Sequence, residues 1–301
     1  MIKSIGTDST GMRRYLFKPK DYVVITKYLL EYVESNLRSG RSCFKVTPNL
    51  GITYVNACVL NGVLRINEIS INLELAKSVI RDDDSVYVIV NSELLPIKFY
   101  DSVKRKFYKL RSLGMDKPPT LEINGIHMHR IEGIDPLSDA YIKVKSIRPL
   151  VNGYVLDIGT GLGYTAITAM KLGARKVISV EVDENVLNIA TFNPWSRELS
   201  NVDILLGNAI KIIKEFDDNT FTHLIHDPPR FELAGELYSY EFYREMYRVL
   251  KPGGKLFHYV GKPKQRRANI IKGVKERLRR AGFTRIIWIE DALGFKAIKY
   301  A

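Results

Sequence analysis

Three acidic residues in the second half of the chain each stand at the end of a short apolar run that predicts a buried strand. These residues are Asp157, Glu181 and Asp227. The carboxyl ends of parallel strands meet at one edge of a sheet, which is where α/β proteins bind their ligands. Carboxylates gathered there accept hydrogen bonds from hydroxyl groups and attract cations. The sequence therefore predicts a ligand site at this edge of a parallel sheet.

A glycine-rich turn follows the first of these strands and leads into a predicted helix. Gly159, Gly161 and Gly163 alternate with larger residues in this turn. Glycine has no Cβ, so the backbone can turn sharply and come close to a ligand. The turn is typical of a nucleotide-type site, although plain tight turns between strands and helices have the same composition.

The acids around this turn distinguish between cofactors. Glu181, at the tip of the second strand, can accept hydrogen bonds from both ribose hydroxyls of NAD or of S-adenosylmethionine (AdoMet). Asp157 would repel a pyrophosphate, whereas AdoMet has no phosphate and carries a sulfonium and an ammonium; the alternative is a turn or capping acid. A third strand ends at Asn208, which can reach adenine. We therefore expect AdoMet, bound by Asp157, Gly159, Thr160, Gly161, Gly163, Tyr164, Glu181, Val182, Asn208, Ala209 and Asp227.

The fourth strand ends in the segment Asp227-Pro228-Pro229-Arg230. The two prolines fix φ and remove two backbone donors, so the segment offers acceptors only. Hydrogen bonds to the Asp227 carboxylate and the Pro228 carbonyl would orient an exocyclic amine, and the carboxylate can take its proton. We predict that these four residues are catalytic and need neither a metal nor a cysteine nucleophile. A rigid turn after a strand is the alternative.

Composition limits the class of protein. The 301 residues are 46% hydrophobic and 26% charged, and no apolar run approaches the roughly 20 residues that span a bilayer. We expect a soluble, cytoplasmic protein that does not bind a membrane. Cys43 and Cys58 are too few for a disulfide framework, so we expect buried free thiols. His127 and His129 have no third ligand in view, and no metal site is predicted.

The charge predicts a polyanionic partner. The net charge is +13, and ten basic residues with one acid lie between 262 and 285. RNA is the expected partner, although such a run can also be a solvated helix face. Residues 104–111 interleave basic and aromatic side chains, which suits phosphate contacts and base stacking; a basic amphipathic helix with its aromatics in the core is the alternative.

Two domains are predicted, with a linker at 116–119. Residues 1–118 read as a smaller α+β domain, expected to bind RNA, with Asn61-Gly62 as a hairpin turn. Residues 119–301 read as an α/β domain, because strands and helices alternate from Tyr154 onward. The last two strands, 285–289 and 295–300, are joined by a short loop and must be antiparallel.

The fourth-strand segment resembles the Asp/Asn-Pro-Pro-aromatic motif of class I methyltransferases that methylate exocyclic amines of cytosine, adenine or guanine. Arg230 departs from that motif, since it stands where the base-stacking aromatic is expected. A guanidinium plane can also stack on a base, and Phe231 is adjacent. The resemblance implies a Rossmann-like class I methyltransferase sheet.

More closely, the last 180 or so residues resemble an archaeal family of Rossmann-fold methyltransferases. The motifs that carry the resemblance are Pro119, His127-Met-His129-Arg130, the glycine turn, Asn193-Pro-Trp195-Ser196, His226 to Arg230, Ala234 to Ser239 and Phe257-His258-Tyr259. A member of that family is implicated in forming N4,N4-dimethylcytidine in small-subunit ribosomal RNA, so the resemblance implies ribosomal RNA as substrate and cytidine N4 as target. Asn193, Trp195, His226 and His258 are second-tier site candidates.

Three other functions are weighed against this one. Residues 236–243 are similar to a segment of aminopropyltransferases, whose cationic substrates are disfavoured by an isoelectric point near 9.5. A non-catalytic RNA-binding protein with this fold is disfavoured by the intact acids. Protein methylation stays open because a fold does not fix a substrate. The sequence does not indicate an oligomeric state.

Overall fold

The computed structural model describes residues 12–81, 83–261 and 268–300. The chain divides into two compact units. The first, here called the methyltransferase unit, comprises residues 1–17, 137–187 and 198–301, and the second, the N-terminal unit, comprises residues 18–136 and 188–197.

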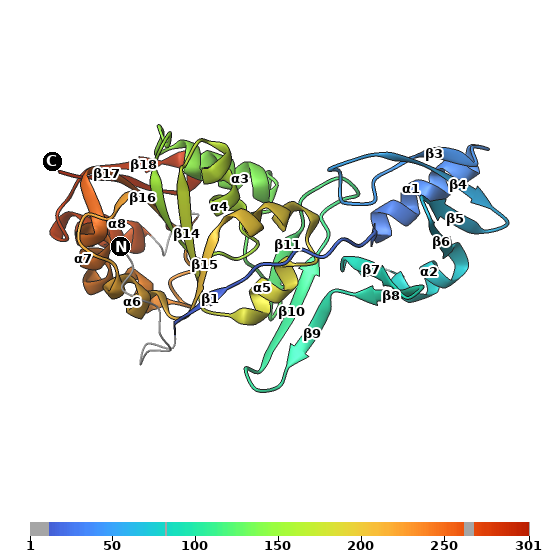
Figure 1. Cartoon of the computed structure of the whole chain (residues 1–301), viewed down its shortest axis with the longest axis horizontal. Coiled ribbons are helices and arrows are strands. Elements are labelled where there is room, and N and C mark those ends of the chain that lie inside the picture. The colour runs from blue at the N-terminus through green and yellow to red at the C-terminus, as the bar shows by residue number, and fades with distance from the viewer. Residues whose placement is uncertain (1–11, 82, 262–267, 301) are drawn as a thin grey trace. The chain divides into compact units, whose positions relative to one another are not determined.

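One eight-stranded sheet forms the centre of the methyltransferase unit in the described part of the chain, in the order β1-β15-β14-β13-β16-β17-β19-β18 (Figure 1). The five strands from β15 to β17 are parallel, whereas β1, β19 and β18 are antiparallel to their neighbours. The predicted fold class is therefore confirmed, including the antiparallel final hairpin. The strands are β1 (Arg13–Tyr15), β13 (Tyr154–Ile158), β14 (Lys176–Glu181), β15 (Asp203–Leu206), β16 (Phe221–His226), β17 (Leu250–Tyr259), β18 (Phe283–Ile289) and β19 (Gly294–Lys299).

The helices of this unit present apolar faces to the sheet. In α7, Phe242, Tyr243, Met246 and Val249 recur at helical spacing and all four are buried. They share one core with side chains of β13, β14, β16 and β17. Ser239 starts the helix, since its hydroxyl accepts a hydrogen bond from the amide of Phe242 at 3.2 Å. The helices are α3 (Pro136–Lys145), α4 (Tyr164–Lys171), α5 (Glu184–Ala190), α6 (Ala209–Ile212), α7 (Tyr240–Val249) and α8 (Ala268–Arg280), with 3-10 turns η1 (Pro194–Asn201), η2 (Ile213–Glu215), η3 (Gly235–Tyr238) and η5 (Glu290–Ala292).

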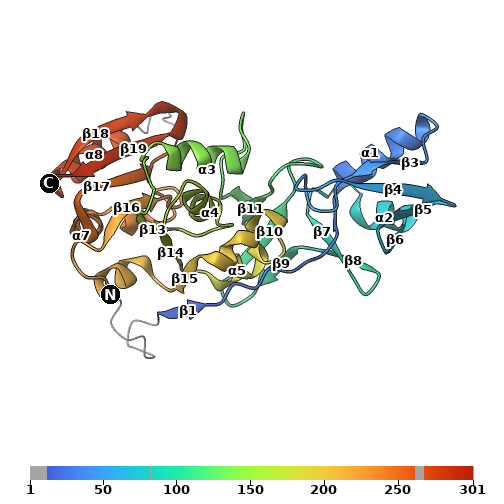
Figure 2. The same ribbon diagram turned by 45° about the horizontal axis from the view of Figure 1, so that its top comes forward.

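In the described ranges, the N-terminal unit contains antiparallel sheets and the helices α1 and α2 (Figure 2). The Asn61-Gly62 hairpin is confirmed, because both residues have positive φ between the paired strands β4 and β5. A three-stranded sheet has the order β2-β7-β8, and two four-stranded sheets have the orders β3-β4-β5-β6 and β12-β11-β10-β9. The elements are β2 (Val24–Ile25), α1 (Lys27–Arg38), β3 (Cys43–Val46), β4 (Val55–Leu60), β5 (Val63–Ile66), β6 (Ile69–Asn72), α2 (Leu73–Ile80), β7 (Tyr87–Val90), β8 (Glu93–Pro96), β9 (Lys98–Asp101), β10 (Lys106–Arg111), β11 (Thr120–Ile123) and β12 (Ile126–His127).

The helical alternative for residues 104–111 is wrong. Residues 106–111 form β10, which pairs with β9 and β11. Alternation along the strand buries Tyr108 and Leu110 and leaves Phe107 exposed on the other face. The interleaving of basic and aromatic residues is therefore the period-two pattern of a strand.

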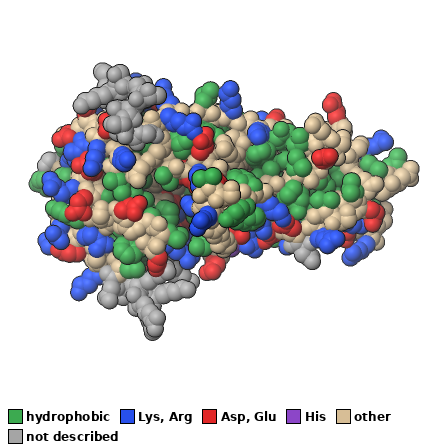
Figure 3. All heavy atoms as spheres, turned by 90° about the horizontal axis from the view of Figure 1, so that it is seen from below, with side chains coloured by type: hydrophobic (Ala, Val, Ile, Leu, Met, Phe, Trp, Pro, Cys, Tyr) green, Lys and Arg blue, Asp and Glu red, His purple; other side chains and the backbone are tan. Residues whose placement is uncertain are grey.

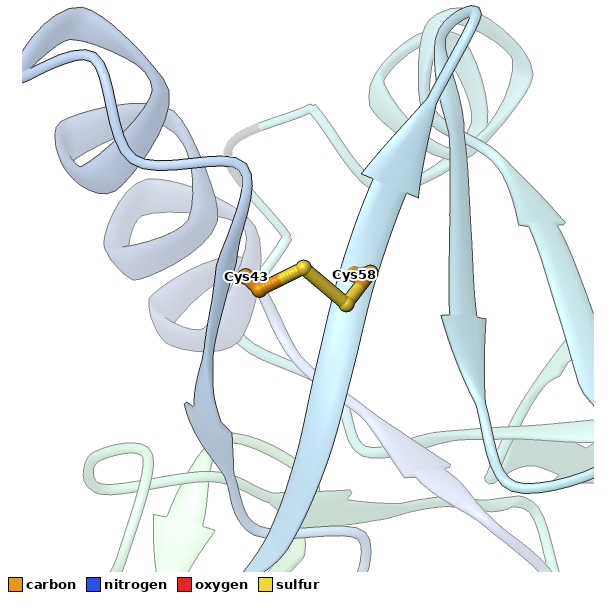
Figure 4. The surroundings of a disulfide bond; sticks show 2 residues. All are labelled: Cys43 and Cys58. Carbon is orange, nitrogen blue, oxygen red and sulfur yellow. A yellow bond between two sulfur atoms is a disulfide. The ribbon is translucent and has the colours of Figure 1, made fainter.

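The expectation of buried free thiols is also wrong. Cys43 on β3 and Cys58 on β4 are register partners with a Cα–Cα distance of 4.1 Å, and they form a disulfide (Figure 4). Both residues are exposed. Sequence spacing did not reveal the pairing because the two cysteines are 15 residues apart and meet only through the register of β3 and β4.

The compact units differ from the predicted domain boundary at 118/119. Strands β11 and β12 pair with β10, so residues 119–136 group with the N-terminal unit. Residue 13 onward forms β1 at the edge of the methyltransferase sheet, beside β15. No helix in the described ranges is long and apolar enough to cross a membrane.

Candidate functional site

The register of the central strands brings the three predicted acids to one edge of the sheet. Ile158, the last residue of β13, pairs with Val180 on β14 and with His226 on β16. Glu181 directly follows Val180, and Asp227 directly follows His226, so both acids lie one residue beyond the partners of Ile158 at the same edge of the sheet. The amide of Asp227 donates to the Ile158 carbonyl at 3.2 Å, which extends the pairing one step beyond β16.

The glycine turn lies against this edge and depends on glycine at two positions. Gly159 has φ +96°, and a Cβ there would lie 2.9 Å from the carbonyl oxygen of Asp227. Gly163 has φ +81°, and a Cβ there would lie 2.4 Å from the Leu199 side chain. Gly159 thus lets the turn approach the tip of β16, and Gly163 lets it approach Leu199 on η1, at distances that no other residue permits.

Asp157 is fully buried beneath the turn. Its two carboxylate oxygens accept hydrogen bonds from the hydroxyls of Thr165 (2.8 Å) and Ser179 (2.6 Å). Burial and, to a smaller extent, the charges of Asp227 and Glu181 together raise the pKa of Asp157 to about 7, against the opposing effect of these two hydroxyls. The three acids are therefore close enough to influence one another's charge.

Glu181 is held by backbone amides instead of hydroxyls. One carboxylate oxygen accepts from Gly161 at 3.0 Å, and the other accepts from Val182 at 2.9 Å and Asp183 at 3.0 Å. Burial raises the pKa of Glu181, and these amides oppose that rise. The carboxylate is fixed in place, and the oxygen that accepts from Gly161 keeps acceptor capacity for a further donor.

The other predicted cofactor residues divide by exposure. The side chains of Thr160 and Tyr164 are buried, and Thr160 bonds the Ser179 hydroxyl at 2.7 Å. Val182 is 68% exposed directly after Glu181. Asn208 is exposed and caps α6, since its side-chain oxygen accepts from the amide of Ile210 at 2.8 Å, and Ala209 is half-buried.

Asp227 has a partner that the sequence interpretation did not identify. The ammonium of Lys143, on α3, lies 3.0 Å and 2.8 Å from the two carboxylate oxygens of Asp227. It also lies 2.8 Å from a carboxylate oxygen of Asp139, one helical turn earlier, and 4.2 Å from the ring centre of Tyr259. Asp139 and Lys143 stand four residues apart on a helix, a spacing that more often indicates a surface ion pair.

The proline segment after Asp227 is exposed at its far end. Pro228 is buried, whereas Pro229 and Arg230 are exposed. The Tyr238 hydroxyl donates to the Pro229 carbonyl at 2.9 Å and fixes the path of the segment. Phe231 is partly exposed beside Arg230 and meets the Tyr238 ring edge to face, with centroids 5.4 Å apart.

His226 and His258 lie in the core on the other face of the sheet. Both are fully buried, and their rings stack with centroids 4.4 Å apart. Phe242 packs on His226, and the Tyr243 hydroxyl lies 2.6 Å from a ring nitrogen of His258. Burial lowers the pKa of both histidines. They are neutral core residues, and consecutive residues alternate faces, so His226 points away from the side that carries Asp227.

The remaining candidates lie in the N-terminal unit. His127 contacts Arg111 and Glu122, and His129 lies 3.0 Å from the Thr120 hydroxyl. Trp195 donates its indole N–H to the carbonyl of residue 50, which makes this segment a packing corner. Within the described ranges, no group of three or more His, Cys, Asp or Glu side chains is arranged to hold a metal ion.

The site chemistry fits AdoMet better than a dinucleotide. Three carboxylates surround the turn, and they would repel a pyrophosphate while attracting the two cationic groups of AdoMet. The fixed Glu181 carboxylate can accept from ribose hydroxyls. The glycines of the turn add no side chain that would block a ligand from the backbone beside the tip of β16.

The buried Asp157 generates a prediction about stability. Its pKa is raised from 3.8 to about 7, so the folded protein binds this proton more tightly than the unfolded chain. This contribution is full below pH 3.8 and is lost as the pH rises through about 7, with a slope of up to about 1.4 kcal/mol per pH unit. In urea unfolding, raising the pH from 5 to 8 should destabilise the wild type by about 2 kcal/mol more than Asp157→Asn. Parallel pH curves for the two proteins would show that this carboxyl titrates normally.

Comparison with known proteins agrees with this geometry. Residues 155–254 match the methyltransferase domain family. The chain is 44% identical over 241 residues to the uncharacterized protein MJ1233 of Methanocaldococcus jannaschii, covering 79% of this chain and 81% of that protein. Shorter matches, each 31% identical, are the ribosomal protein L11 methyltransferase of Clostridium perfringens (29% of this chain, 26% of that protein) and ribosomal RNA large subunit methyltransferase I of Aliivibrio fischeri (40% and 31%).

Among solved structures, a spermidine synthase in complex with the transition state analogue AdoDATO superposes with a TM-score of 0.51 at 17% identity, covering 67% of this chain and 71% of that one. At this identity the likeness concerns the fold alone. Together with the strand order and the glycine turn, the sequence matches show that the chain belongs to the same family as the M. jannaschii protein and is a class I AdoMet-dependent methyltransferase.

Proposed function

We propose that the protein methylates an exocyclic amine of RNA, with cytidine N4 of small-subunit ribosomal RNA as the target. The observation that carries this proposal is the Asp227 carboxylate, held at the edge of the sheet beside the glycine turn and followed by two prolines. A carboxylate beside donor-free backbone accepts hydrogen bonds from an amine and offers it no competing donor.

The residues of the strand tips would hold the cofactor. Glu181 would accept the ribose hydroxyls, and the exposed Val182 would contact the flat face of adenine, with Asn208 within reach of its edge. Gly159 and Gly161 would let the backbone lie against the cofactor, and Asp157 beneath them supplies negative potential for its cationic groups. The buried side chains of Thr160 and Tyr164 would act through their backbone and through packing.

Asp227 and Pro228 would prepare the amine. When bound, AdoMet supplies a methyl group: the amine lone pair forms the new N–C bond, the S–C bond breaks with its electron pair staying on sulfur, and the amine then loses a proton. The Asp227 carboxylate and the Pro228 carbonyl would each accept a hydrogen bond from one N–H group of the amine. These hydrogen bonds would orient the nitrogen and draw its lone pair out of the ring. Asp227 is also placed to receive the released proton. Most of the acceleration would come from positioning and electrostatics.

The base would stack on the exposed end of the same segment. Arg230 presents a guanidinium plane, and Phe231 lies beside it with its ring anchored edge-on to Tyr238. Planar cations and aromatic rings are the groups on which unpaired RNA bases stack. This arrangement supports a flat nucleobase as acceptor.

A hairpin of the N-terminal unit offers a surface for RNA. Tyr100 and Phe107 are direct cross-strand partners on β9 and β10, 61% and 36% exposed. The exposed turn that joins these strands carries Lys104 and Arg105. Exposed aromatics beside basic residues are typical of surfaces that bind single-stranded nucleic acid. This surface supports the assignment of RNA binding to the N-terminal domain, proposed here as residues 1–118.

The basic segment between 262 and 285 supports RNA binding less directly. Residues 262–267 lie outside the described part of the chain. In α8, Arg277 donates to the Tyr238 carbonyl and Arg280 lies over the Tyr240 ring, while Lys272 and Lys275 are exposed. On the face drawn in Figure 3, basic and acidic side chains are interspersed. On this face, phosphate contacts are therefore expected at particular basic residues rather than across a broad patch.

Two other acceptors are outcomes of the same test. The match to a ribosomal protein L11 methyltransferase supports a protein acceptor, and the segment 236–243 resembles an aminopropyltransferase. Labelled methyl groups from AdoMet should enter ribosomal RNA, and digestion should place the label on cytidine N4. Label in protein, on a ribose hydroxyl or on a ring carbon would refute the proposal.

The role of Asp227 gives a kinetic prediction. Asp227→Ala should lower turnover by about 10²- to 10⁴-fold, because the amine loses its acceptor, while AdoMet affinity measured by calorimetry should change little. Since this variant removes one of the two carboxylate partners of the buried Lys143, the double variant Asp227→Ala/Lys143→Met serves as the folding control and should stay inactive. A single variant with wild-type turnover would remove Asp227 from the mechanism.

The hairpin gives a binding prediction. Tyr100→Ala and Phe107→Ala should each weaken RNA binding by about 1–3 kcal/mol, the value of stacking one base, and leave AdoMet affinity unchanged. Tyr300→Ala, at an exposed aromatic of the methyltransferase unit, is the matched control. Wild-type affinity should fall steeply with salt, because counterions are released. If the hairpin variants bind RNA as the control does, this surface does not contact RNA.

A further inference from the structure

The ion pair between Lys143 and Asp227 is buried to an unusual degree. Lys143 is 4% exposed, and its ammonium is shared between the carboxylates of Asp227 and Asp139 under the ring of Tyr259. A lysine that stands four residues after an aspartate on a helix normally extends its ammonium into solvent. A buried ion pair is often no more stabilising than apolar side chains of the same size. Stability alone therefore does not account for an ammonium at this position.

Asp227 is the member of this ion-pair cluster that is most exposed to a substrate. The side chains of Lys143 and Asp139 are 5% and 2% exposed, whereas that of Asp227 is 20% exposed. An incoming acceptor therefore meets the edge of the Asp227 carboxylate and not the ammonium behind it. Each carboxylate oxygen bonded to Lys143 keeps acceptor capacity for another N–H.

Resting on the proposed function, we propose that Lys143 is a positioning residue that keeps Asp227 ionised and fixed, and that it restricts the acceptor to a neutral amine. A neutral amine, such as that of a nucleobase, can donate to the exposed edge of Asp227. A cationic amine, such as a polyamine or a lysine side chain, would bring a second positive charge to the Asp227 carboxylate, which is already paired with the Lys143 ammonium. The ion pair therefore favours the base over the cationic acceptors.

The groups that surround Asp227 support the first half of this proposal. Acidic and phenolic groups of the described residues surround the ion pair: Asp139 on α3 raises the pKa of Asp227, Asp227 raises the pKa of Asp157 on β13 and of Tyr238 on η3, and Tyr259 on β17 raises the pKa of Lys143. Burial raises the pKa of Asp227, and Lys143 is the group that lowers it. The pKa of Lys143 itself is raised, because the attraction of Asp227 and Asp139 outweighs burial. Without this ammonium, Asp227 would bind a proton at higher pH and lose its acceptor capacity.

A pH profile separates this role from a structural one. Lys143→Met keeps the volume of the side chain and removes its charge. Turnover should then require a higher pH, and the acid limb of the profile should move up by at least about one pH unit, the effect of losing one close opposite charge. Lys145→Met, two residues later on the exposed side of α3, should leave the profile unchanged. Superimposable profiles for Lys143→Met and the wild type would overturn the proposal.

Uptake of a small cation tests the second half without RNA. In the presence of S-adenosylhomocysteine, Lys143→Ala should bind ethylammonium, because it leaves two carboxylates and a space of matching size, whereas the wild type should not. In the methylation assay the same ethylammonium should partly restore Lys143→Ala turnover. Equal ethylammonium binding by both proteins would show that the lysine does not exclude a cation.

A milder variant at Asp139 guards against misfolding of the Lys143 variants. The pH profile and ethylammonium binding then separate this proposal from the proposed function. Asp139→Asn retains the lysine and removes a carboxylate that raises the pKa of Asp227, so it should move the acid limb to lower pH, opposite to Lys143→Met; movement to higher pH would count against the proposal. If the wild type methylates no RNA but only Lys143→Ala binds ethylammonium, the proposed function fails and the role of Lys143 stands. If RNA is methylated and neither readout changes, Lys143 is structural.

Discussion

Carboxylate charge gathered at the buried edge of a parallel sheet must be compensated, and the methyltransferase site depends on how this is done. A buried ionised carboxylate is unstable unless hydrogen bonds or an opposite charge replace its water. The chain meets this constraint in a different way at each strand tip. Asp157 is bonded by two hydroxyls, Glu181 by three backbone amides, and Asp227 by a lysine ammonium.

These three forms of compensation give the carboxyl groups different chemistry. At Asp157 burial outweighs the two hydroxyl hydrogen bonds and raises the pKa to about 7. The charge of Asp157 therefore responds to charged groups that bind near it. The amides at Glu181 come from the glycine turn and the start of the next loop, which couples the position of the turn to this acid. Lys143 gives Asp227 a permanent partner of opposite charge, which suits its proposed role of accepting hydrogen bonds from an amine.

The sequence was sufficient for the parts of the structure that follow from local pattern. Short apolar runs ending in acids, the Asn61-Gly62 turn and the short final loop predicted the strands and the antiparallel edge. Contacts that depend on register or on packing between distant segments were missed: the Cys43–Cys58 disulfide needs the register of two strands, and Lys143 lies 84 residues from Asp227. The basic and aromatic alternation at 104–111 left a helix open as an alternative, because eight residues are too few to separate the two periods by pattern alone. His226 and His258 were site candidates because the sequence places both near the ends of strands. The sequence does not show which face of the sheet each side chain occupies, and the structure places both in the core.

The central claim is that this site methylates cytidine N4 in small-subunit ribosomal RNA. Mass spectrometry of nucleosides from the ribosomal RNA of a strain that lacks the gene tests it most directly, with a strain that carries Asp227→Ala beside it. The proposed function predicts that N4-methylated cytidine disappears from small-subunit RNA in both strains while the other methylated nucleosides persist. A full complement of N4-methylated cytidine in the deletion strain would contradict it.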